Sequence, residues 1–161
     1  MERMELLDQI ETVWLDWQGL LSRLTPADMV QPELPGGWSV KDAIAHIAFC
    51  EEWVGTFIAT RAWPPAKHPS LDTTDMDAQN DAYFALNKDL ALDDVLEESH
   101  RVHQHLVDTI TALTDEQYHD RDLLGAPPDE QWELKKLIDG NTFKHYPDHA
   151  EATRDWLASR E

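Results

Sequence analysis

Two histidines lie four residues apart near the end of the chain, at His145 and His149. Side chains at i and i+4 of an α-helix project side by side, so this pair can bind one metal ion through one ring nitrogen each. Two ligands hold a metal weakly, and a third has to come from another part of the chain. The spacing alone favours the alternative, in which the two rings are hydrogen-bonded inside the protein.

The stretch 132–156 predicts where these rings point. Both histidines fall on one helix face together with three apolar residues, within roughly 60° of one another at about 100° per residue. The apolar residues are Leu134, Ile138 and Trp156. An imidazole buried there without a partner costs about 1–3 kcal/mol. Gly140 and Pro147 interrupt the stretch, and Pro147 predicts a kink between the two histidines.

His46 is the best-placed candidate for a third ligand. It lies on the flank of the apolar face of a helix that the sequence predicts from Ser39 to about Arg61. Ser39, with Asp42 three residues later, forms a capping-box pattern at the start of this helix. Because this helix has to pack against the last one in a small bundle, His46 can approach the two later histidines.

Other residues offer weaker chemistry. His100, His103 and His105 form a rival cluster. His100 and His103 are three apart and could chelate a metal, but His105 points elsewhere, and only His103 borders the apolar stripe. We expect these residues on the surface. Cys50 lies one turn after His46, so a Cys/His nucleophile pair is conceivable. A lone cysteine on an apolar helix face more often behaves as a small hydrophobic residue.

The chain is strongly acidic, with 13 Lys and Arg against 32 Asp and Glu among 161 residues and a formal net charge of −19. We expect the acids, including Glu51 and Glu52, on solvated faces. The charge repels phosphate backbones and anionic lipids, so neither nucleic acid nor membrane is expected as a partner. No apolar run approaches the ~20 residues that cross a bilayer, and the lone Cys50 and an acidic N-terminus favour a cytoplasmic protein.

Spacings of three and four between apolar residues predict four main helices. They cover residues 2–24, 39–61, 93–113 and 132–156. A more polar helix is expected over 74–90, and the proline-rich connection 62–73 is long enough to fold over one end of the bundle. The predicted fold class is therefore all-α, a four-helix bundle with long connections, in a single domain over 1–161.

Two blocks of the sequence resemble the DinB-like superfamily. Residues 37–47 read GWSVKDAIAHI, and residues 140–149 read GNTFKHYPDH. In combination they are similar to the DinB/YfiT-like metalloenzymes, and more narrowly to their ClbS/DfsB branch. The resemblance spans nearly the whole chain. It implies a four-helix bundle in which His46, His145 and His149 bind a divalent metal, commonly zinc or nickel.

The resemblance also bears on function. It implies a metal-dependent hydrolase or thiol transferase that acts on a small electrophilic molecule, with a low-molecular-weight thiol as a second cofactor. Asn141 and Tyr146 are the candidates for contacts behind the metal ligands or to the substrate. Resembling proteins are frequently dimers, so a homodimer is expected. The alternative is a non-catalytic bundle that sequesters a toxin or another small molecule between apolar walls at Trp38, Trp53 and Trp63.

Overall fold

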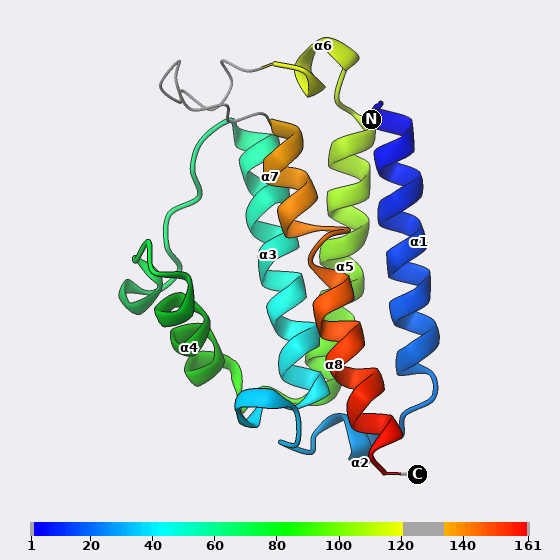
Figure 1. Ribbon diagram of the computed structural model, residues 1–161. Helices are drawn as coiled ribbons and strands as arrows, with labels where there is room; N and C mark the ends of the chain where they lie inside the picture. The colour runs from blue at the N-terminus through cyan, green and yellow to red at the C-terminus, as the bar shows by residue number, and fades with distance from the viewer. Residues whose placement is uncertain (1, 121–133, 161) are drawn as a thin grey trace.

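The computed structural model describes residues 2–120 and 134–160 (Figure 1). The segments with amphipathic patterns form the long helices of a bundle. These helices are α1 (Arg3–Leu21), α3 (Val40–Thr60), α5 (Leu92–Thr111) and a divided fourth unit of α7 (Leu134–Asn141) and α8 (Tyr146–Ala158). α1 and the fourth unit run in one direction, and α3 and α5 run in the other (Figure 1). The chain therefore has to return along the bundle between α3 and α5.

The predicted all-α class is confirmed. Within 2–120 and 134–160 there is no strand, only an isolated bridge between Leu34 and Trp38. Short helices fill the connections: α2 (Pro26–Met29) and the 3-10 turn η1 (Pro35–Gly37) precede α3, and α6 (Asp115–Tyr118) follows α5. None of the described helices is both long enough and apolar enough to cross a membrane.

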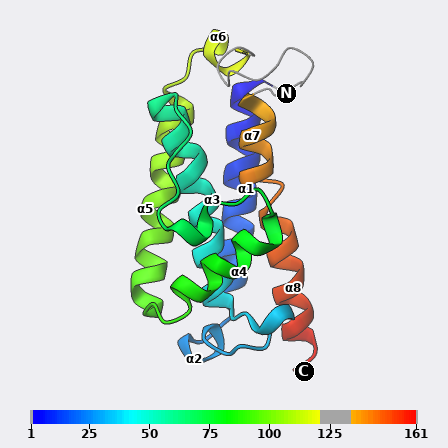
Figure 2. The same cartoon turned by 90° about the vertical axis from the view of Figure 1, so that its left-hand side faces the viewer.

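The connection between α3 and α5 contains the 3-10 turn η2 (Pro69–Leu71) and α4 (Met76–Asn87). α4 corresponds to the polar helix predicted over 74–90. The connection does not cover an end of the bundle as expected. It returns along the side of α3, and α4 lies across the flank of the bundle (Figures 1 and 2). The reason is the parallel course of α3 and α5, because the chain has to travel the full length of the bundle between them.

The last unit is broken rather than kinked. Four residues, 142–145, separate the end of α7 from the start of α8, and Pro147 lies in the first turn of α8. Inside a continuous helix the proline ring would clash with the carbonyl of Phe143, whereas the first turn of a helix accepts proline without loss of a hydrogen bond. The prediction of one long helix was therefore wrong at this point. Its first residues, including Trp132, lie outside the described residues.

The core consists of two apolar clusters with polar residues between them. On α3 the first cluster ends at Ile47 and the second begins at Val54, and the buried Glu51 lies between them. On α5 the buried His103 lies in the same way between Val95 and Leu106. The bundle thus buries a polar layer at the level where α3, α5 and α8 meet.

Candidate metal centre

The first turn of α3 fixes the position of His46. The Ser39 hydroxyl accepts a hydrogen bond from the backbone N–H of Asp42. The Asp42 carboxylate accepts hydrogen bonds from the backbone N–H (2.8 Å) and the hydroxyl (2.6 Å) of Ser39. The predicted capping box is confirmed. His46 follows on the same helix and is 6% exposed, so the bundle holds its ring in place.

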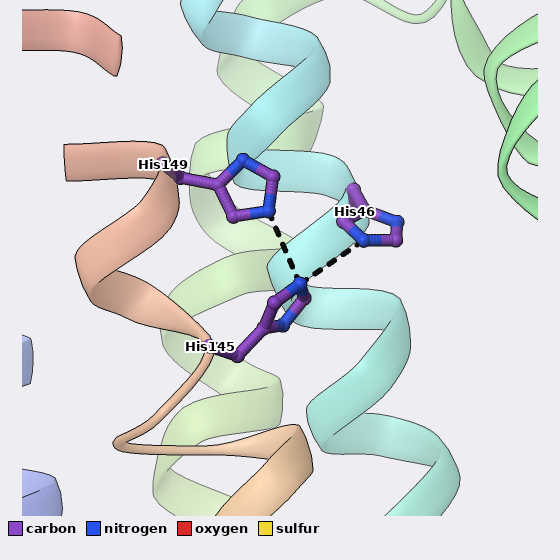
Figure 3. A group of neighbouring side chains, drawn as sticks. All are labelled: His46, His145 and His149. Carbon is purple, nitrogen blue, oxygen red and sulfur yellow. Dashed lines mark hydrogen bonds between the residues drawn. The ribbon is translucent and has the colours of Figure 1, made fainter. Parts of the chain in front are cut away.

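The turn between α7 and α8 positions the other two histidines. The backbone N–H of His145 donates to the Thr142 carbonyl at 2.8 Å, which starts a new helical turn after the break. His145 has helical backbone angles, φ −87° and ψ −38°, although it precedes α8. His145 and His149 are therefore still one helical turn apart on the same side, and both rings face α3 (Figure 3).

Three ring nitrogens meet between α3 and α8 (Figure 3). The Nε2 atom of His145 lies 3.1 Å from Nε2 of His46 and 3.1 Å from Nε2 of His149. The ligand atoms of all three residues lie within 4.8 Å of one another. The structure thus brings together the three residues named from the sequence, although 99 positions separate His46 from His145.

Hydrogen bonding alone does not account for this arrangement. A neutral imidazole nitrogen either carries one proton or offers one lone pair, so His145 Nε2 cannot satisfy both neighbouring nitrogens. A cation would accept all three lone pairs at once. Two nitrogens bound at about 2.0–2.1 Å to a tetrahedral zinc lie roughly 3.3 Å apart, close to the distances here.

Burial keeps the three rings neutral at pH 7. It lowers the pKa of His46 to about 4, with a smaller contribution from the neighbouring His145. Burial, followed by the charges of His145 and His46, lowers the pKa of His149 to about 3. The pKa of His145 is also lowered by burial, while the Asp148 carboxylate opposes the shift. Neutral imidazoles keep the lone pairs that metal ions require, so the three-histidine cluster could bind a metal.

The cluster opens into a cavity of about 380 Å³. One wall is Trp38, whose ring centroid lies 5.4 Å from that of His46 and 6.5 Å from that of His149. Asn80 of α4 and Asp148 of α8 add polar groups to the lining. The cavity therefore offers an aromatic face, an amide and a carboxylate next to the three ring nitrogens.

The three tryptophans expected to form one apolar wall lie in two places. Only Trp38 lines the histidine cavity. Trp53 lines a different cavity beside α3. Trp63 packs against Trp53, with their ring centroids 5.4 Å apart. Their spacing in the sequence could not show this, because Trp63 belongs to the connection after α3.

The rival cluster does not form, and one of its members is not on the surface. His100 and His105 are exposed, but His103 is only 5% exposed. Its ring stacks on that of Trp14, with ring centroids 3.9 Å apart and an angle of 7° between the ring planes. The expectation of a surface position was wrong for His103 because the ring occupies the inner face of α5. Its spacing of three from Leu106 and seven from Ile110 was the signal that could have shown this.

Glu51 was also expected in the solvent, and it is 1% exposed. Its carboxylate lies 3.2 and 3.3 Å from Nδ1 of His103 and accepts a hydrogen bond from the Tyr146 hydroxyl at 2.8 Å. Spacing again carried the signal, since Glu51 follows Ile47 by four residues and precedes Val54 by three on the buried stripe of α3. Its charge misled the interpretation, because buried acids occur where partners are present.

Cys50 lies beside the cluster, with Sγ 4.0 Å from Nε2 of His46. Burial, and to a lesser extent the Glu51 charge, raise the pKa of its thiol to about 12. The thiol therefore stays protonated at neutral pH, which disfavours a nucleophilic role.

Asn141 and Tyr146 make contacts away from the three rings. Asn141 Nδ2 donates to the Leu137 carbonyl at 2.8 Å, and the Tyr146 hydroxyl donates to Glu51. Among the hydrogen bonds of the described residues, none joins either side chain to a histidine of the cluster. Their predicted role toward ligands or substrate stays a prediction.

The sequence matches the family model of the DinB superfamily over residues 9–150. The chain belongs to the DinB superfamily. The resemblance noted in the two sequence blocks is thereby confirmed. None of the curated proteins matches the chain in sequence.

Several solved structures share this DinB-like fold over nearly the whole chain. An uncharacterised protein from Escherichia coli UTI89 is 19% identical with a TM-score of 0.80, over 99% of this chain and 94% of that one. DfsB, a sibling lethal factor precursor, is 16% identical with a TM-score of 0.81, over 100% and 98%. The colibactin self-resistance protein ClbS, in complex with a double-stranded DNA, is 17% identical with a TM-score of 0.77, over 98% and 96%. At these identities the likeness shows the fold.

The ClbS structure corrects the expectation about nucleic acid. The net charge of −19 was taken to exclude such partners, yet ClbS, a protein of this fold, was crystallised in complex with a double-stranded DNA. The exclusion was wrong because net charge sums the whole surface, whereas phosphate contacts depend on a few local basic groups and on backbone N–H donors. A DinB-like bundle is thus no argument against nucleic acid as a partner.

Proposed function

We propose that this DinB-superfamily protein binds a divalent metal through His46, His145 and His149 and acts on a small electrophilic molecule as a hydrolase or thiol transferase. The observation that carries the proposal is the convergence of three Nε2 atoms, two pairs of them 3.1 Å apart, at the wall of a cavity. Zinc or nickel suits three imidazoles.

A divalent ion bound there supplies Lewis-acid chemistry, because it lowers the pKa of a water or thiol that it coordinates toward 7. The chain supplies the rest. The three histidines leave coordination positions free for a water, a thiol or a substrate. Asp148, an acid of the cavity wall, is the group that would accept the proton from the attacking water or thiol. Trp38 shields one side of the site and offers a flat apolar face to the substrate.

Metal analysis of purified variants tests the proposal. We expect one divalent ion per chain in the wild type, and loss of that ion in His46→Ala and His145→Ala. Removal of a group that only hydrogen-bonds a metal ligand lowers metal affinity by up to ~100-fold. Removal of a ligand itself should therefore lower the affinity by more than that. His105→Ala is the matched control, since His105 is exposed and outside the cluster. Stoichiometric metal in all three variants would refute the site.

A second candidate is a non-catalytic protein that sequesters a toxin or another small molecule. It is favoured by the aromatic wall that Trp38 gives the cavity, because Phe84 stacks on the Trp38 ring, with centroids 5.5 Å apart at 13°, and holds it in place. This function predicts that binding of the small molecule survives the loss of all three histidines. The metal-dependent function predicts that turnover disappears with them.

A further inference from the structure

Two adjoining cavities lie apart from the histidine cluster, one between α3 and its connection to α4, the other between α3, α4 and α5. Their volumes are about 650 and 550 Å³, within the range of roughly 300–1,000 Å³ that is typical of small-molecule sites. Both are lined by Phe49, Glu52, Lys67 and Leu71, so they share a wall. None of the residues that line the histidine cavity lines either of them.

Both cavities have apolar residues in their walls. In the first cavity, Phe49 and Trp53 of α3 face prolines of the connection and the buried Leu71. In the second, small residues of α3, Ala45 and Ala48, leave space beneath the side chains of α4. Flat aromatic and small aliphatic surfaces of this kind favour a flat apolar molecule.

α4 forms the cover of the second cavity without belonging to the core. None of its residues is buried, and Leu86 is 43% exposed although it lines the cavity. Polar contacts hold the cover in place: Gln79 Nε2 donates to the Leu71 carbonyl at 3.0 Å, and the Tyr83 hydroxyl donates to the Ala45 carbonyl at 2.8 Å. A ligand beneath α4 would therefore gain apolar contacts that the helix does not make with the bundle.

The charges of the walls disfavour an anion. The basic groups are Lys67 and His68, and Lys67 is paired with Glu52. Asp72 and Asp94 also line the cavities and have no ion pair among the described residues. Together with the net charge of −19, these carboxylates repel negative ligands.

We propose that the paired cavities beneath α4 are a second binding site, for a small, flat, apolar molecule that carries no negative charge. The site does not need the metal, because the histidine cluster and the cavities have separate walls. They are neighbours through Tyr83, whose ring centroid lies 6.1 Å from that of His46 and 4.4 Å from that of Phe49.

Two fluorescent probes with the same anilinonaphthalene body test the proposal. N-phenyl-1-naphthylamine is uncharged, and 8-anilino-1-naphthalenesulfonate carries one negative charge. We expect saturable binding of the uncharged probe to metal-free protein, and at least tenfold weaker binding of the sulfonate. Equal affinity for both probes would overturn the assigned ligand class.

Variants locate the probe. Thr56→Phe places a ring in the first cavity and should weaken binding at least tenfold, and Leu86→Ala removes part of the cover and should weaken it several-fold. Thr12→Phe and Leu15→Ala make the same changes on the exposed face of α1 and should leave affinity within twofold. His46→Ala should also retain binding. Loss of binding in His46→Ala, or unchanged binding in Thr56→Phe with a native circular dichroism spectrum, would refute the site.

Discussion

We expect the hydrogen bond of the Tyr146 hydroxyl to contribute more to the free energy of unfolding than a comparable hydroxyl hydrogen bond to an uncharged acceptor. The hydroxyl donates to the carboxylate of Glu51 at 2.8 Å, and that carboxylate is 1% exposed. Burial, and then the Glu51 charge, raise the pKa of Tyr146 far above its usual value, so the phenol stays protonated and keeps donating. In Tyr146→Phe the buried carboxylate keeps only the contact with His103.

The magnitude follows from the type of acceptor. A hydrogen bond to a charged group contributes about 1.5–3 kcal/mol, and one to a neutral group about 0.5–1.5 kcal/mol. Tyr83→Phe is the matched control, because the Tyr83 hydroxyl donates at the same 2.8 Å to an uncharged acceptor, the Ala45 carbonyl. We expect Tyr146→Phe to lower the free energy of unfolding by ~2 kcal/mol and Tyr83→Phe by ~1 kcal/mol.

Urea unfolding followed by tryptophan fluorescence measures both losses. Metal affinity supplies a second measurement, since Tyr146 follows His145 directly and starts α8. Tyr146→Phe should weaken metal binding several-fold although all three metal ligands are retained. If the hydroxyl contributed only to local stability, the metal affinity would be unchanged. Equal unfolding free energies for the two variants would refute the reasoning that Glu51 presents a buried charge to Tyr146.

Two further predictions concern the histidines. The unfolded rings have a pKa near 6.5, and the folded pKa values of His46 and His149 are about 4 and about 3, so the unfolded chain binds protons that the folded chain does not. Stability of the metal-free protein should be complete above pH 6.5 and fall as the pH drops, down to about 4 for the His46 contribution and about 3 for that of His149, by up to ~1.4 kcal/mol per pH unit and ring; a flat profile in urea unfolding between pH 7 and 5 would contradict this. Pro147→Ala should cost at most ~1 kcal/mol, through the freer unfolded chain, and should retain metal, because the first turn of α8 forms with either residue; loss of metal would show that the proline itself aligns the two rings.

Local patterns predicted the elements, and long-range packing decided the rest. The capping box at Ser39 and Asp42 and the stripe of α3 needed only neighbouring residues, so the sequence was sufficient for them. His46 could be named as a flank residue, but its approach to His145 depends on how α3 and α8 pack. Glu51 was expected in the solvent because it is an acid, although its position on the apolar stripe of α3 indicated burial.

The break before α8 shows a different limit. Pro147 predicted a kink between the two histidines, but the break lies between α7 and α8, and His145 already has helical backbone angles. Whether a chain kinks or starts a new helix depends on what the new first turn can bind. Here Tyr146 finds Glu51 across 95 positions of the chain, and no local pattern contains that partner.

α3 and α8 are joined at two polar contacts, and the two differ in what they require. The contact of Glu51 with Tyr146 is complete within the chain, whereas His145 Nε2 cannot satisfy both His46 and His149, and a cation would satisfy all three Nε2 atoms. Because His145 and Tyr146 are adjacent, the permanent contact holds the first turn of α8 against α3 whether or not a metal is bound. The histidines are therefore preorganised, and metal binding should add stability without ordering new helix. A circular dichroism titration with zinc would show this as an unchanged helical signal together with a higher unfolding temperature, and a gain of helix would show instead that the metal, not Glu51, docks α8.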